Sequence, residues 1–112
     1  MNVLPGASHI LEDVRKRFDS RLRAVTIARS NEVYFDAEME LVPGFCAHLY
    51  KKWNARLVSV FADDARDTQK VFQILYIFAL DSVGVFFILR IPVPPDKPEF
   101  TSLTNAVHAV NW

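Results

Sequence analysis

VFQILYIFALDSVGVFFILRI, residues 71–91, contains two apolar runs separated by the tetrapeptide DSVG at positions 81–84. Phe, Ile, Val and Tyr dominate both runs, and these residue types favour β-strands. The whole stretch could also be taken for a membrane-spanning helix, but such a helix needs about 20 uninterrupted apolar residues. Gln73 and the aspartate of the tetrapeptide interrupt this one. We therefore predict that residues 71–80 and 85–91 form an antiparallel hairpin.

Both predicted strands carry apolar residues at successive positions, so that both of their faces are apolar. This pattern is typical of central strands that are covered on both sides, whereas strands with one solvated face alternate between apolar and polar residues. The helices of a small two-layer domain cover only one side of its sheet. We therefore expect the other face of this sheet, or part of it, to need a partner.

Upstream of the hairpin, the sequence predicts a helix over about residues 8–19, followed by a second hairpin. The helix is amphipathic, with Ser8 as its expected N-cap. Its apolar positions are Ile10, Leu11, Val14 and Phe18. Residues 22–28 are β-branched and apolar, and a turn at Ser30 and Asn31 separates them from an alternating strand around Val33, Phe35 and Ala37.

A second helix is predicted to begin at Pro43 and Gly44, because proline is tolerated in the first turn of a helix. Asn54 is its expected left-handed terminator. A third strand over residues 56–62 and a polar loop over residues 63–68 follow. The apolar stripe of this helix consists of Val42, Phe45, Cys46, Leu49 and Trp53.

The predicted order is α-β-β-α-β-β-β-α, with a proline-rich crossing before the last helix, which begins at about Ser102. Helices packed on one face of a mainly antiparallel sheet give an α+β fold. We expect one domain over residues 1–112, truncated at its C-terminus, in which residues 93–112 form the crossing and a docking segment.

The composition of the chain argues against several classes of partner and of cellular location. The chain has 112 residues, 51% of them hydrophobic, and 13 basic residues balance 13 acidic ones. A formal charge of zero gives no broad attraction to nucleic acid, so no nucleic-acid partner is expected. The single cysteine, Cys46, excludes an internal disulfide and suits a reducing compartment. The first residues lack the pattern of a signal peptide. We expect a cytoplasmic protein without a membrane span.

The sequence contains few candidates for catalytic or metal-binding residues. Cys46 and His48 lie two positions apart on the second helix and therefore point about 200° away from each other, so they cannot share a metal ion or form a nucleophile–base pair. Cys46 is interpreted as a buried small hydrophobe and His48 as a solvent-facing residue. Asp63, Asp64 and Asp67 lack the alternating ligands of a calcium loop. We expect no catalytic residue, metal or cofactor in this chain.

The C-terminal residues carry a resemblance. Prolines occupy positions 92, 94, 95 and 98, and the segment KPEFTSLT at 97–104 is followed by Val107, Ala109, Asn111 and Trp112. This segment resembles the one that leads into the signature of the thirty-kilodalton subunit family. That family includes the 30-kDa subunit of proton-pumping NADH:quinone oxidoreductase (complex I) and the N-terminal domain of the large subunit of formate-hydrogenlyase-type nickel–iron hydrogenases. The KPEF wording is more similar to the hydrogenase branch, and the Glu-Arg-Glu run that follows the Trp in the family is absent here.

The resemblance implies a non-catalytic structural and docking module of a membrane-associated oxidoreductase complex, peripheral to the membrane. Its partner would be the catalytic large subunit of a hydrogenase or of complex I, and the redox cofactors would lie in partner subunits. The positions implied for docking are Pro98, Phe100, Ser102, Thr104, Asn111 and Trp112. Phe100 and Trp112 would be aromatic anchors, or they close the core of the domain itself. Self-association through this segment is a further expectation.

Two other function classes remain open. The first is a small α+β ligand-binding or protein-interaction domain that is unrelated to redox complexes. It predicts polar residues that converge on a pocket between the helices and the sheet, whereas the inward positions of this sequence are nearly all apolar. The second is a small independent enzyme.

Overall fold

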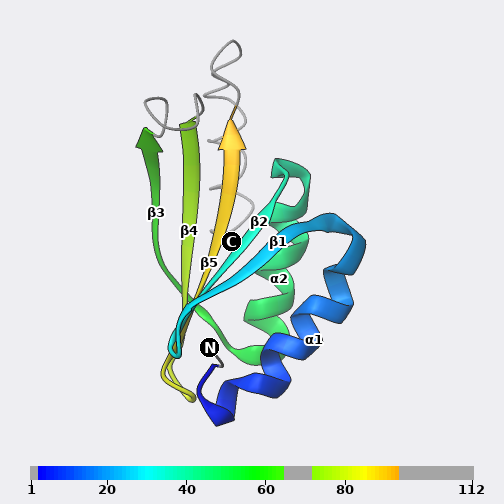
Figure 1. Ribbon diagram of the computed structural model, residues 1–112, viewed down its shortest axis with the longest axis vertical. Helices are drawn as coiled ribbons and strands as arrows, with labels where there is room; N and C mark the ends of the chain where they lie inside the picture. Colours follow the sequence, from blue (N-terminus) through cyan, green and yellow to red (C-terminus); the bar gives the residue numbers. More distant parts are fainter. Residues whose placement is uncertain (1–2, 65–71, 94–112) are drawn as a thin grey trace.

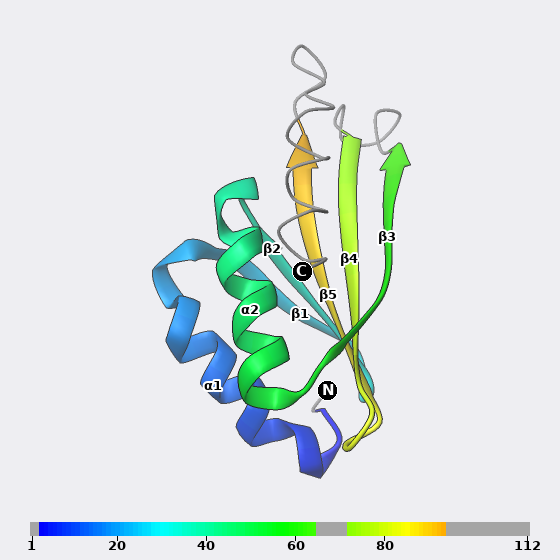
Figure 2. The ribbon, with the colours of Figure 1, turned by 180° about the vertical axis from the view of Figure 1, so that it is seen from behind.

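The computed structural model describes residues 3–64 and 72–93, which form a two-layer α+β domain. Two α-helices lie against one face of a five-stranded sheet (Figures 1 and 2). In chain order the elements are α1 (Ser8–Phe18), β1 (Leu22–Arg29), β2 (Glu32–Ala37), α2 (Val42–Trp53), β3 (Arg56–Asp64), β4 (Phe72–Leu80) and β5 (Val85–Val93). The predicted fold class is confirmed, and the helix expected from Ser102 lies outside the described residues.

The central hairpin forms as predicted, with β4 and β5 antiparallel and Leu80 opposite Val85. The carbonyl of Leu80 accepts hydrogen bonds from the amides of Val83 at 3.1 Å and Gly84 at 2.9 Å. Gly84 has a φ of 68°, in the left-handed region that glycine occupies without steric cost. Among the described residues, no helix is long and apolar enough to cross a membrane.

The sheet has the strand order β1-β2-β5-β4-β3, so that the two hairpins meet at β2 and β5. These two strands are parallel, with Val33 opposite Phe87 and Phe35 opposite Leu89. All other neighbouring strands are antiparallel. The chain leaves the end of β2 and passes through α2, β3 and β4 before it returns as β5. Strand β5 is therefore the central strand of the sheet.

The core lies between the helices and the covered face of the sheet, and aromatic rings form its centre. The ring of Phe45 on α2 lies 5.3 Å from Phe35, 5.4 Å from Phe18 and 5.9 Å from Phe78, measured between centroids. Phe35 in turn lies 5.0 Å from Phe87. Helix α1, helix α2 and three strands thus contribute to one aromatic cluster. Cys46 is buried beside it, as predicted.

Two local predictions need correction. Ser8 is not the N-cap of α1: the helix begins at Ser8 itself, and the Ser8 hydroxyl donates instead to the carbonyl of Pro5 at 3.1 Å, across a short 3₁₀ turn. Asp63 and Asp64 do not begin a loop, because pairing with Gln73 and Phe72 extends β3 through both of them. The rest of that predicted loop lies outside the described residues. Asn54, in contrast, ends α2 in the predicted left-handed conformation, with a φ of 54°.

Adjacent phenylalanines on β5 provide a test of this arrangement. Phe87 is fully buried and Phe86 is 40% exposed, because successive residues of a strand point to opposite faces. Phe87→Ala is expected to lower the free energy of unfolding by about 3–5 kcal/mol, since it leaves a cavity in the aromatic cluster. Phe86→Ala is the matched control and is expected to cost less than about 1 kcal/mol. Urea denaturation of both variants measures the difference, and equal losses would contradict the assignment of the two faces.

Candidate docking surface

The six docking positions implied by the C-terminal resemblance lie outside the described residues, so the structure places none of them. They are Pro98, Phe100, Ser102, Thr104, Asn111 and Trp112. Residues 3–64 and 72–93 contain three candidate features: the sheet face that α1 and α2 leave open, a polar cluster between these helices, and hollows along the helix margins.

The open face of the sheet carries an apolar patch on its two central strands. The register places Leu75 and Ile77 of β4 on this face, beside Ile88 and Phe86 of β5. Ile88 is only 5% exposed, whereas Phe86 is 40% exposed. We call these four residues the β4–β5 patch. Within the described residues, this patch agrees with the expectation that helices cover only one side of the two apolar strands, since α1 and α2 both lie on the other face (Figure 2).

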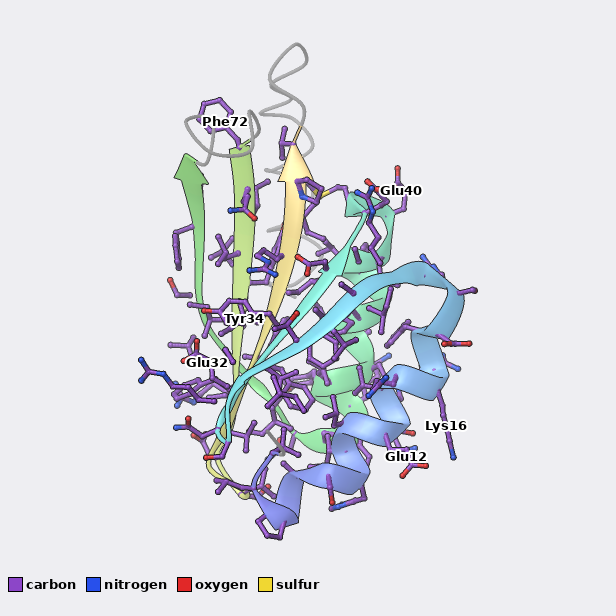
Figure 3. All side chains as sticks on the ribbon, in the orientation of Figure 1. Glu12, Lys16, Glu32, Tyr34, Glu40 and Phe72 are labelled. Carbon is purple, nitrogen blue, oxygen red and sulfur yellow. The ribbon has the colours of Figure 1, made fainter. Side chains whose placement is uncertain are left out.

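An ion pair stacked on an aromatic ring borders this patch on the same face. Arg90 of β5 donates through Nε to Asp36 Oδ1 at 2.6 Å and through its second guanidinium nitrogen to Oδ2 at 2.8 Å. Its guanidinium carbon lies 4.7 Å from the ring centroid of Tyr34. Figure 3 views this face, with Tyr34 and Glu32 labelled on β2. The hydrogen bond to Asp36 raises the pKa of Arg90, and partial burial lowers it by less. Both side chains therefore stay charged, and each has the other as its hydrogen-bond partner.

The second feature, between the helices, is the Asp13 cluster, formed by Asp13 of α1 with His48, Lys52 and Trp53 of α2. Asp13 Oδ1 accepts from Lys52 Nζ at 2.7 Å, and Oδ2 accepts from His48 Nε2 at 2.7 Å and from Trp53 Nε1 at 2.8 Å. Burial raises the pKa of Asp13, but the hydrogen bonds from Lys52, His48 and Trp53 together lower it well below its usual value. The carboxylate therefore stays charged and ties the two helices together.

The prediction that His48 faces solvent is wrong, since its side chain is only 13% exposed. His48 instead packs its ring edge-on against Phe18, at 5.6 Å between centroids. Asp–His pairs occur in catalytic sites, where the histidine activates a nucleophile. Cys46, two positions before His48, does not serve as that nucleophile. Burial raises the pKa of the Cys46 thiol to about 12, which keeps it protonated at neutral pH. Within the described residues, no group of three His, Cys, Asp or Glu side chains is arranged to hold a metal ion.

Hollows occur along both helices. One of about 330 Å³ lies between the end of α2 and strands β3 and β4, and an ion pair of Arg56 with Asp81, at 3.2 Å, borders it. Its other described lining residues are Cys46, Tyr50, Asn54, Ala55, Leu57 and Phe78. Another, of about 580 Å³, follows the outer side of α1 past Leu11 and Arg15. The first is the better candidate for a ligand, because polar side chains ring an apolar wall.

Comparisons with known proteins add no relative: no protein-family model matches the chain, and no curated protein matches it. The resemblance of the C-terminal residues therefore stays a prediction.

The Asp13 cluster predicts a defined pH dependence of stability. The pKa of Asp13 is lower in the folded chain than in the unfolded chain, so its contribution is present above the ordinary aspartate pKa of about 4 and is lost as the pH falls through the lower folded value. Asp13→Asn is expected to lower the free energy of unfolding at neutral pH by about 1–2 kcal/mol. The variant should also lose less stability than wild type as the pH falls below about 4.

Glu12→Gln supplies the control for this prediction. Glu12 pairs with Lys16 at 3.0 Å on the outer side of α1, where both side chains are more than half exposed and point away from the sheet (Figure 3). Its removal is expected to change the free energy of unfolding by less than about 0.5 kcal/mol. Thermal or urea denaturation over a pH series measures both variants. Identical pH profiles for Asp13→Asn and wild type would contradict the role assigned to Asp13.

Proposed function

We propose that this chain is a non-catalytic docking module of a membrane-associated oxidoreductase complex and packs against the catalytic large subunit. The complex is of the formate-hydrogenlyase or energy-converting hydrogenase type, or of the complex I type. The module is cytoplasmic and peripheral to the membrane, and the redox cofactors belong to its partner subunits. The observation that carries the proposal is the β4–β5 patch, an apolar surface on the central strands of the sheet that the two described helices, α1 and α2, leave open.

The composition of the open face supports protein docking. Contiguous apolar patches on monomers often mark interaction sites, and aromatic and arginine side chains dominate the energetics of interfaces. Phe86 supplies an exposed aromatic ring, and Arg90 lies on the ring of Tyr34 beside it. Because Asp36 already neutralises Arg90, a partner can cover this ion pair without leaving a buried charge unpaired. The face therefore combines an exposed apolar side chain, Phe86, with a bordering ion pair, Arg90 and Asp36, whose charges are already paired before a partner binds.

The resemblance supplies the identity of the partner. In the family that residues 97–112 resemble, the large subunit receives the segment after the tryptophan. Under this proposal, Pro98 stiffens the approach of the C-terminal segment, and Phe100 and Trp112 are its anchors. The segment and the β4–β5 patch would then contact the same large subunit, since the segment follows directly after β5. The two surfaces can be tested separately because their residues do not overlap.

Affinity purification of the tagged 112-residue chain from its native membrane fraction tests the proposal. The catalytic large subunit of a hydrogenase or of complex I should co-purify. Phe86→Asp is expected to weaken its binding at least about tenfold, since it replaces an exposed aromatic side chain of the apolar contact with a charge. A Phe100→Ala, Trp112→Ala variant should weaken binding by a similar factor. Quantitative mass spectrometry of the eluate measures both effects.

Lys16→Glu is the control, because Lys16 lies on the outer side of α1 and points away from the sheet (Figure 3). It should leave the recovery of the large subunit unchanged. The proposal fails if the large subunit is present in the extract and does not co-purify. If the large subunit binds Phe86→Asp as well as wild type while the C-terminal variant is impaired, docking uses the C-terminal segment alone.

A second candidate function, the binding of a small ligand, is favoured by the hollow between α2 and β3. Phe78 and Leu57 line an apolar wall, and the Arg56–Asp81 ion pair supplies both charges at the rim. Binding here would stabilise wild type in a thermal-shift screen of small polar metabolites. A Leu57→Trp variant, which fills the hollow, would abolish that stabilisation. The docking proposal is preferred because it accounts for the exposed Phe86, which lies on the opposite side of the sheet.

A further inference from the structure

The outer edge of β3 is a second surface, formed by the backbone of that strand and adjoining the open face, on which Phe61 lies opposite Leu75. Strand β3 is the last strand of the sheet order, and within residues 3–64 and 72–93 no strand pairs with its outer side (Figure 1). The backbone N–H and C=O groups along such an edge are a template for another strand. Proteins usually protect an edge with charged residues, proline or a bulge.

The middle of β3 carries little protection of this kind. Residues 57–62, with the sequence LVSVFA, contain no charge and no proline. Val58 is 46% exposed and Phe61 is 45% exposed. An irregularity in the pairing with β4 lies between Leu57 and Ser59, near the start of the strand, so the following residues keep a regular register. This edge is therefore open to pairing from Ser59 onward.

Charges at the two ends of β3 are opposite in sign, and this feature identifies the partner strand. Arg56 begins the strand, and Asp63 and Asp64 end it. The other edge strand, β1, carries Arg23 and Arg29 near its two ends. If two copies of β1 paired antiparallel, arginine would face arginine and the pair would be destabilised. If two copies of β3 paired antiparallel, Arg56 of each copy would face the aspartates of the other.

We propose that β3 pairs antiparallel with β3 of a second copy of this chain, which joins the two sheets across a two-fold axis. When the axis passes through Val60, Ser59 lies opposite Phe61 of the second copy. The irregularity between Leu57 and Ser59 then brings Arg56 opposite Asp63 of the second copy, because residues opposite each other belong to the same face of the sheet and these two pair with Ala79 and Gln73 on one face of β4. This register therefore places two arginine–aspartate pairs at the ends of the new ladder. An interface of this kind is isologous, as in most homodimers.

The present partner of Arg56 does not prevent this arrangement. Arg56 contacts Asp81 of its own chain at 3.2 Å, but both side chains are more than half exposed. Exposed ion pairs of this kind contribute little to stability, so Arg56 can exchange or share its partner. Pairing through the β3 edge also leaves the β4–β5 patch uncovered. The dimer is therefore compatible with the proposed docking function and does not depend on it.

Sedimentation velocity of the 112-residue chain over a concentration series tests the proposal. Wild type should show a reversible monomer–dimer equilibrium. Phe61→Lys is expected to weaken dimerisation at least about tenfold, since lysine is the residue that protects natural sheet edges. Phe86→Asp, which changes the open face, should leave the dimer unchanged. A dimer that Phe86→Asp disrupts and Phe61→Lys preserves would place the contact on the open face and overturn the proposal.

Charge exchange provides a second test that does not depend on the apolar contact. Arg56→Glu alone, and Asp63→Lys with Asp64→Lys, should each weaken self-association about tenfold, because like charges then face each other at both ends. A mixture of these two variants should form heterodimers with affinity close to that of wild type, since every end pair is again of opposite sign. Asp81→Asn controls for the loss of the ion pair within the chain and should dimerise like wild type.

Two results would overturn the proposal. The first is a wild-type chain that stays monomeric at every concentration. The second is a mixture of the charge variants that associates no better than either variant alone. Loss of dimerisation in Phe61→Lys together with recovery in the mixture is the pattern expected only from antiparallel pairing of β3. Neither result bears on binding to the large subunit, so the two proposals fail independently.

Discussion

The parallel pairing of β5 with β2 is the interaction on which the rest of the structure depends. Without it, the chain would contain the β1–β2 hairpin and a separate three-stranded meander of β3, β4 and β5, and a two-stranded hairpin is marginally stable alone. The pairing places Val33 beside Phe87 and Phe35 beside Leu89, all of them buried. On the opposite face, the same register brings Arg90 to Asp36. One strand thus completes the core on one side and positions an ion pair on the other.

This central position explains why β5 is apolar at nearly every residue. Its inward side chains pack beneath α2, and its outward ones, Phe86 and Ile88, lie on the open face. The helices are held on the opposite face by the aromatic cluster around Phe45 and by the hydrogen bonds of Asp13. Because both α1 and α2 pack on that face, no helix among the described residues covers the outward apolar side chains of β4 and β5. A partner protein is the cover that we propose.

Local patterns in the sequence predict the helices, strands and turns. The pairing of distant strands and the contacts between distant side chains depend on long-range packing, and local patterns do not predict them. The apolar runs around the turn at Asp81 predict the central hairpin, and Asn54 predicts the end of α2, because turn and cap preferences depend on neighbouring residues. The parallel pairing of β2 with β5 has no local signal, since it joins residues such as Asp36 and Arg90 that lie far apart in the chain. Neither partner of the stacked ion pair is predicted from the sequence as part of a site.

The Asp13 cluster shows the same limit. His48 and Lys52 are four residues apart and therefore share one face of α2, and Trp53 follows directly. This spacing indicates a polar stripe, but nothing in it reveals that α1 places a carboxylate against the stripe. The prediction of a solvent-facing His48 fails for that reason. The extension of β3 through Asp63 and Asp64 is missed because acidic residues favour loops, whereas pairing with β4 decides the outcome.

Site-specific photo-cross-linking within the native complex tests the central claim, that the open face of the sheet is the docking surface. A photoreactive phenylalanine analogue would replace Phe86 on the open face and, in a second variant, Glu12 on the outer side of α1. The account predicts that position 86 cross-links to the catalytic large subunit and that position 12 does not. Cross-links to the large subunit from position 12 and none from position 86 would show that the helical side docks instead, and would contradict the account.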